Sequence, residues 1–173
     1  MKRLIALFYM VFFIIILISS LAEAGPEEDA IVKNIKDAAK ALTDFPKTRD
    51  AQSALKFYAN DYFTISDGQV ETLKQAEDNL AYLKEQINLG NRVGISMQIS
   101  NIKAETSGAI GWATYDYTTK IWVGRDVLVE EQGKCTAIHR KKGSGWLIQH
   151  EHCSAIPKED EDHLEKGQPE RTI

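Results

Sequence analysis

The spacing of the apolar residues changes once along the chain, and this change constrains the fold more than any single motif. Between residues 26 and 45, apolar residues such as Ile31 and Ile35 recur at intervals of three or four, the period of one helix face. Further along the chain the period becomes two, and Val93 and Ile95 alternate with small or polar residues. Helices followed by strands predict an α+β domain whose helices cover one face of a sheet.

Three helices are expected, over residues 26–45, 48–60 and 72–87. Pro46 should end the first helix, because the residue before a proline is pushed out of the helical conformation. Thr48 is placed to cap the second helix. Thr72 and Gln75 have the spacing of a capping box, which predicts the start of the third helix.

The strands are expected over residues 93–99, 109–122, 127–140 and 146–155, after a short β-like run at 62–65. Residues 66–68 should turn the chain after that run, and Gly133 is a candidate for a bulge. These segments predict a curved antiparallel sheet of four to five strands packed on the three N-terminal helices. A curved sheet of this kind leaves a cleft between its concave face and the helices.

Residues 1–24 have the three parts of a secretory signal peptide: basic Lys2 and Arg3, an apolar run, and small residues placed for cleavage. We expect cleavage after Ala24, which would give a secreted or periplasmic protein without a stable membrane anchor. The apolar run is close to the length that spans a bilayer, so an uncleaved anchor is the alternative.

Cleavage would leave one domain over residues 25–156, followed by a charged, disordered tail over 157–173. Without Lys2, Arg3 and Glu23, the 21 basic and 25 acidic residues become 19 and 24, a net charge of −5. An acidic chain without a basic stripe is a poor candidate for nucleic-acid binding, so none is predicted.

The sequence contains two cysteines, Cys135 and Cys153, and both lie in the last two expected strands. An even pair in an exported protein is more often bonded than free. If the connecting turn lies near residues 143–145, the pair faces the same side of neighbouring strands, which permits a disulfide. Two buried thiols are the alternative.

Three segments carry a resemblance to a known family: FYANDYF from residue 57, GWATYDY from residue 111 and WLIQHEHCS from residue 146. Together they resemble the SnoaL-like members of the nuclear transport factor two-like superfamily. The last two strands are also similar to the association domain of calcium/calmodulin-dependent protein kinase two. The resemblance implies a cystatin-like cone that pairs as a homodimer through the outer face of its sheet. It does not define an activity, because this superfamily includes enzymes, binding domains and oligomerisation domains.

Family site residues transfer poorly to this chain. Ketosteroid isomerases of the superfamily place a general base near Ser66, which makes Asp67 the candidate after a shift of one residue. Their hydrogen-bonding acid corresponds to Ala137, which cannot donate. The arginine that lines the pocket of the kinase association domains corresponds to Thr114.

Strict alternation places Trp146, Ile148, His150 and His152 on one face of the last strand, with Thr136 and Ile138 beside them. We assign this face to the cleft, although a slip of one residue would exchange the faces. His150 and His152 are then either proton-transfer or orienting groups or structural hydrogen-bonding residues. No metal site is predicted, because no third ligand accompanies the pair.

Asp116 lies between Tyr115 and Tyr117 and is a candidate buried base. The alternative is an ordinary acid at a sheet edge or in a hydrogen-bonded pair. The large aromatic side chains Tyr62, Trp112, Tyr115 and Trp146 suit an apolar or aromatic ligand, and they suit an ordinary core equally well. No nucleotide-binding fingerprint is present, and no cofactor is predicted.

The sequence therefore favours an exported SnoaL-like domain that binds a small, largely apolar or aromatic molecule in the cleft. Its expected ligand-binding residues are Tyr62, Trp112, Thr114, Ile138, Ile148, His150 and His152. An acid-base enzyme of the isomerase, dehydratase or cyclase type is the first alternative, with Asp116 or Asp67 as base and His150 as partner. A protein association module is the second, so whether the protein is an enzyme stays open.

Overall fold

The computed structural model describes residues 25–156, so the expected signal peptide and C-terminal tail lie outside the described residues. Within this range the chain forms three helices and six strands. In chain order they are α2 (Pro26–Thr48), α3 (Ala51–Leu55), β1 (Tyr58–Ser66), β2 (Gln69–Thr72), α4 (Leu73–Asn88), β3 (Val93–Ser107), β4 (Ile110–Val123), β5 (Asp126–Lys142) and β6 (Gly145–Ala155). None of the helices in this part of the chain is long and apolar enough to cross a membrane.

Helix α2 is the longest helix, and it continues past the proline that was expected to end it. Pro46 lies inside its last turn, and Arg49, in the left-handed conformation, caps the helix by donating its backbone N–H to the Phe45 carbonyl at 2.8 Å. The expectation of an end at Pro46 is wrong. A proline in the last turn removes only one hydrogen bond, and the fully buried Phe45 ring holds this turn against the core.

Helix α3 is shorter than expected and has a different cap. Asp50, not Thr48, is the N-cap, and its carboxylate accepts from the Ser53 backbone N–H at 3.1 Å. The helix ends at Leu55 because the chain enters β1 at Tyr58. Helix α4 begins as expected, with the capping box of Thr72 and Gln75 confirmed.

The predicted turn at residues 66–68 joins β1 to β2, a short strand that was not expected. Asp67 and Gly68 both have positive φ angles, of 47° and 80°. A turn whose two central residues both have positive φ angles has a twist that matches the twist of the two strands it joins in a hairpin. The hairpin register runs from Ser66–Gln69 to Phe63–Thr72 and places the start of α4 at the edge of the sheet.

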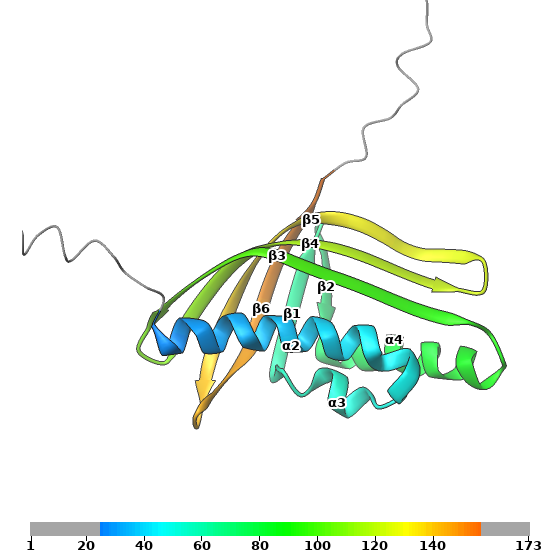
Figure 1. Cartoon of the computed structure of the whole chain (residues 1–173), viewed down its shortest axis with the longest axis horizontal. Helices are drawn as coiled ribbons and strands as arrows, with labels where there is room; N and C mark the ends of the chain where they lie inside the picture. The colour runs from blue at the N-terminus through cyan, green and yellow to red at the C-terminus, as the bar shows by residue number, and fades with distance from the viewer. Residues whose placement is uncertain (1–24, 157–173) are drawn as a thin grey trace, which may run out of the picture.

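The strands form one sheet in the order β2-β1-β6-β5-β4-β3. All neighbours pair antiparallel except β1 and β6, which pair parallel. The α+β class is confirmed, and the expected antiparallel sheet of four to five strands is instead a mixed sheet of six in the described chain. Figure 1 shows the long strands β3, β4 and β5 arching over the helices, with α2 lying across the sheet's concave face.

Gly133 is not a bulge. It pairs in regular register with Tyr117 on β4 and Ala155 on β6, and the irregularity between β4 and β5 falls instead near Trp122. A Cβ atom at Gly133 would lie 2.1 Å from the Ser154 carbonyl oxygen. Glycine is therefore required here for close approach of two backbones.

The core fills the space between the concave face of the sheet and the helices. One cluster, under the N-terminal half of α2, contains Ile31, Ile35, Ala113, Tyr115, Tyr117, Cys135, Ala137 and Trp146. A second, at the other end, contains Phe45, Ala54, Leu55, Leu80, Leu83 and Ile95. Ala38, Tyr62 and Ile148 form a third cluster.

Candidate functional site

A cavity of about 330 Å³ lies among these clusters and is the candidate functional site. Its walls come from α2, α3, α4 and all six strands. The apolar part is formed by Ile35, Ala38, Ala39, Leu42, Leu55, Ala76, Leu80, Leu83, Ile95, Met97, Ile99, Ile121, Val129 and Ile148. The polar part is formed by Tyr58, Tyr62, Thr64, Ser66, Glu71, Asn79, Tyr115, Tyr117, Thr119, Glu131 and Glu151, and the cystine of Cys135 and Cys153 completes the wall.

Glu151 is the buried acid of this cavity. Its side chain projects from β6 toward the inner face, and the residue is only 9% exposed. Tyr62 on β1 donates its hydroxyl to Oε2 at 2.7 Å, and Tyr115 on β4 donates its hydroxyl to Oε1. Strands distant in sequence therefore bring two tyrosine donors to the two oxygens of one carboxyl group.

Burial raises the pKa of Glu151, and the hydrogen bonds from Tyr115 and Tyr62 and the nearby His150 only partly oppose this. The pKa values of Tyr62 and Tyr115 are raised in turn, first by burial and then by the negative charge of Glu151. Both phenols therefore stay protonated as donors throughout the physiological pH range. A proton on Glu151 is held more tightly than on an exposed glutamate.

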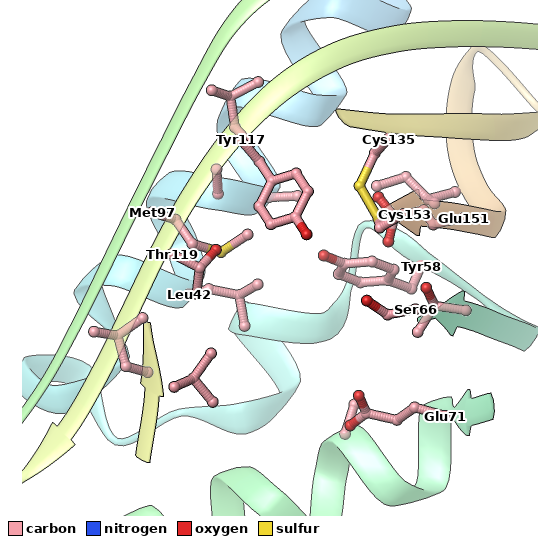
Figure 2. Close-up of a pocket in the computed structure, with 18 of the residues that line it drawn as sticks. Leu42, Tyr58, Ser66, Glu71, Met97, Tyr117, Thr119, Cys135, Glu151 and Cys153 are labelled. Carbon is pink, nitrogen blue, oxygen red and sulfur yellow. A yellow bond between two sulfur atoms is a disulfide. The ribbon is translucent and has the colours of Figure 1, made fainter. Parts of the chain in front are cut away.

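Two further phenols, those of Tyr58 and Tyr117, point into the same space (Figure 2). Tyr117 is 6% exposed, and its hydroxyl has no partner at hydrogen-bond distance among the described residues, although Ser66 lies near enough to lower its pKa against the larger effect of burial. A buried hydroxyl without a hydrogen bond costs folding free energy, and a ligand that forms a hydrogen bond with it would recover that cost. Burial, followed by the charges of Glu151 and Glu71, raises the pKa of Tyr58 well above its usual value.

Cys135 and Cys153 form a disulfide, as the sequence permitted. The two residues stand directly opposite each other on β5 and β6, with their Cα atoms 4.1 Å apart. Figure 2 shows the bridge beside Glu151 in the cavity wall. The cystine therefore joins the two strands that carry the centre of the site.

A bulge in β6 overturns the predicted position of the histidines. Ile148 pairs with His139, whereas His150 pairs with the adjacent Ile138, so Gln149 is an extra residue on β6. The extra residue reverses the alternation of side chains beyond it. His150 and His152 consequently face the outer side of the sheet, where His150 Nδ1 lies 3.1 Å from the Phe63 carbonyl oxygen. Their expected place in the cleft is wrong.

The outer face also holds three other residues that were expected to bind ligand. Trp112 and Ile138 are each 38% exposed and pair with each other across β4 and β5, and Thr114 pairs with Thr136 on the same face. Thr114 and Thr136 are exposed. Among the predicted ligand-binding residues, the structure places only Tyr62 and Ile148 in the cavity wall.

The structure does not bring the predicted acid and base residues together in the cavity. Asp116 lies on the outer face, where Asn101 donates to it at 2.6 Å and Lys134 pairs with it at 2.5 Å. These two partners hold the pKa of Asp116 below its usual value, the opposite of a tuned base. Asp67 is a turn residue whose side chain accepts from the Ala155 backbone N–H at 3.2 Å. Neither acid lines the cavity, and His150 does not either.

Sequence reasoning missed Glu151, although a signal for it was present. Trp146 and Cys153 are seven positions apart, an odd number, so strict alternation cannot turn both inward. If a disulfide places Cys153 inward beside an inward Trp146, the strand between them must contain a bulge. That constraint would have moved Glu151 to the cleft and the two histidines away from it.

The part of the chain that the structure describes has no cluster of three or more His, Cys, Asp or Glu side chains arranged to hold a metal ion. The chemistry available inside the cavity is that of the buried Glu151 carboxyl group and its phenols, together with the less buried carboxyl groups of Glu71 and Glu131. Such a site can hold an apolar body and fix one polar group on it, or exchange a proton with it.

The fold and cavity define the class: a cone-shaped α+β domain with a largely apolar chamber between its sheet and its helices. A model of the SnoaL-like domain matches residues 35–159. The protein therefore belongs to the SnoaL-like family, as the sequence motifs suggested. A comparison with curated proteins found no match.

Solved structures share the fold at low sequence identity. A protein with a cystatin-like fold from Caulobacter vibrioides is 16% identical with a TM-score of 0.56, covering 77% of this chain and 92% of its own. A proposed calcium/calmodulin-dependent kinase II association domain from Exiguobacterium sibiricum is 11% identical with a TM-score of 0.60, covering 79% and 98%. A proposed scytalone dehydratase from Novosphingobium aromaticivorans is 14% identical with a TM-score of 0.58, covering 75% and 83%. These similarities establish the fold alone.

Proposed function

We propose that this SnoaL-like domain binds a small, largely apolar molecule in the cavity, with Glu151 and its tyrosines as the polar anchor. One observation carries this proposal: a chamber of about 330 Å³ with a hydrogen-bonded carboxyl group in an otherwise mostly apolar wall. Its size lies at the lower end of small-molecule sites, which span roughly 300–1,000 Å³. Trp146 packs in the core and Trp112 on the outer face, so neither fills the chamber, which favours a ligand over a pure association module.

The binding of N-phenyl-1-naphthylamine, a neutral probe that fluoresces in apolar sites, tests this function. Thr119 lines the cavity, and Thr118, its neighbour on β4, is exposed on the other face. Thr119→Trp should fill part of the chamber and weaken probe binding by about tenfold or more, a loss of about 1.4 kcal/mol. Thr118→Trp is the matched control and should bind like the wild type. Absence of saturable binding to the wild type, or equal losses in both variants, would contradict the proposal.

Acid-base catalysis is a second candidate, favoured by the raised pKa of Glu151 in a cavity that the Tyr117 side chain also lines. Glu151 would remove a proton from a carbon next to a carbonyl group, whose oxygen Tyr117 would hydrogen-bond. These two residues differ from the predicted combination of Asp116 or Asp67 with His150.

Deuterium exchange into 2-tetralone, followed by NMR, tests this second function. The wild type should exchange the C–H protons about 100-fold or more faster than Glu151→Gln, the usual range for a general base. Because the pKa of Glu151 is raised, the rate should increase with pH only above the range where an ordinary glutamate ionises. Equal rates for both proteins would exclude this catalytic role.

We also propose that the domain is exported, with cleavage after Ala24, and pairs through the outer face of its sheet. Exposed apolar residues on that face support the pairing: Phe63, Ile110, Trp112 and Ile138. The cystine supports an oxidising compartment. Native mass spectrometry of protein purified from the cell envelope would test both points, since it reports the N-terminus and the oligomeric state. Retention of residues 1–24 would contradict cleavage after Ala24, and a monomer would contradict the pairing.

A further inference from the structure

We infer that the ligand of this cavity carries a basic amine, which binds as an ammonium group against Glu151. This inference rests on the proposed ligand-binding function and adds the chemical class of the ligand. It is carried by the charge of the cavity wall, the unused acceptor sites of Glu151, and the unpaired hydroxyl of Tyr117.

The charged residues of the cavity wall are all acidic. Glu71, Glu131 and Glu151 line it, and no lysine, arginine or histidine of the described chain does. Burial raises the pKa of Glu131, and the neighbouring negative charge of Asp67 raises it further. The Asp67 charge adds negative potential on that side of the chamber. A negatively charged guest would meet only like charges, whereas a cation would meet opposite ones.

Glu151 has the capacity for a third partner. A carboxylate accepts about four hydrogen bonds, and Tyr62 and Tyr115 supply one to each oxygen. An ammonium group brings up to three N–H donors, and its positive charge compensates the negative charge of a buried carboxylate. A neutral alcohol supplies one donor and no charge, so it leaves the desolvated carboxylate uncompensated.

The tyrosines that line the cavity suit the same group. The Tyr117 hydroxyl is buried without a partner, and its lone pairs can accept an N–H from an ammonium group. Tyr58, Tyr62 and Tyr115 also line the chamber, and aromatic rings of this kind attract cations in desolvated sites. The apolar wall formed by α2, α4 and β3 would hold the hydrocarbon body of the same molecule.

Three compounds with one apolar body separate the possibilities: 2-naphthylmethylamine, 2-naphthylmethanol and 2-naphthoate. Each is used at pH 7 to displace N-phenyl-1-naphthylamine from the full-length protein. The amine should bind about tenfold or more tighter than the alcohol, as expected for a desolvated charge pair. The naphthoate should bind most weakly of the three. This ranking is measured on the wild type and needs no variant.

Two variants then assign the effect to one carboxyl group. Glu151→Gln keeps the size of the side chain, and it should lose about tenfold or more in amine affinity while its affinity for the alcohol changes less than about threefold. Asp116→Asn removes the same charge from the outer face and should leave all three affinities unchanged. If the Glu151→Gln variant still binds N-phenyl-1-naphthylamine and its circular dichroism spectrum is unchanged, the variant is folded.

The outcomes are distinct for the two proposals. If the probe binds but the alcohol or the naphthoate matches the amine, the amine assignment is overturned and the ligand-binding function stands. Equal loss of amine and alcohol affinity in Glu151→Gln overturns the assignment as well. If the probe does not bind the wild type, both the ligand-binding function and the amine assignment are contradicted.

Discussion

Replacement of Phe45 with alanine is expected to lower the free energy of unfolding by about 3–5 kcal/mol. Phe45 is completely buried in the last turn of α2 and packs in one cluster with Leu55, Leu83 and Ile95. These three neighbours also line the cavity, so Phe45 supports its apolar end from behind. The variant loses the transfer free energy of the ring and leaves a void that the surrounding helices can close only in part.

Urea denaturation followed by circular dichroism measures this loss. Tyr82→Ala is the matched control, because Tyr82 is an aromatic residue of α4 that is 47% exposed. Its effect should stay within about 0.5 kcal/mol. A loss below about 1 kcal/mol for Phe45→Ala would show that this end of the core is not packed as described.

Removal of the disulfide is the second large effect expected. The bridge joins residues 18 positions apart, and the chain entropy of a loop of this length corresponds to about 3 kcal/mol. The double variant Cys135→Ala/Cys153→Ala should be destabilised by about this amount. Dithiothreitol should destabilise the wild type similarly in the same urea experiment.

The reductant supplies the internal control for this experiment. The double variant has no other cysteine, so its unfolding curve should not respond to dithiothreitol. A wild type that is equally unresponsive while intact mass shows reduced thiols would contradict a stabilising role for the bridge.

The helices and long strands could be predicted because their signals are local. The three-four spacing of Ile31 and Ile35 and the capping box of Thr72 and Gln75 each act within a few residues, and the structure confirms both. The parallel pairing of β1 with β6 depends on residues nearly ninety positions apart, such as Phe63 and His150. No spacing within either segment encodes that contact, which explains why the sheet was expected to be antiparallel.

The site could be predicted only as far as its general location. The cleft between sheet and helices was expected, and Tyr62 and Ile148 were placed in it correctly. The acid at its centre, Glu151, was not predicted. Strict alternation was assumed across the bulge at Gln149, and this assumption placed His150 in the cleft instead. Outward residues such as Trp112 were included for their aromatic character, which does not tell the two faces of a strand apart.

The bulge at Gln149 has a consequence for which functional groups a fold of this kind can place in its cavity. On its N-terminal side, Trp146 and Ile148 keep their places in the core. On its C-terminal side, the bulge determines that Glu151 and Cys153 face the cavity in place of His150 and His152. Insertion or loss of a single amino acid in one strand can therefore exchange the functional groups inside a chamber while every other residue stays the same. In such a scaffold, length variation in a strand can alter specificity as strongly as point substitution.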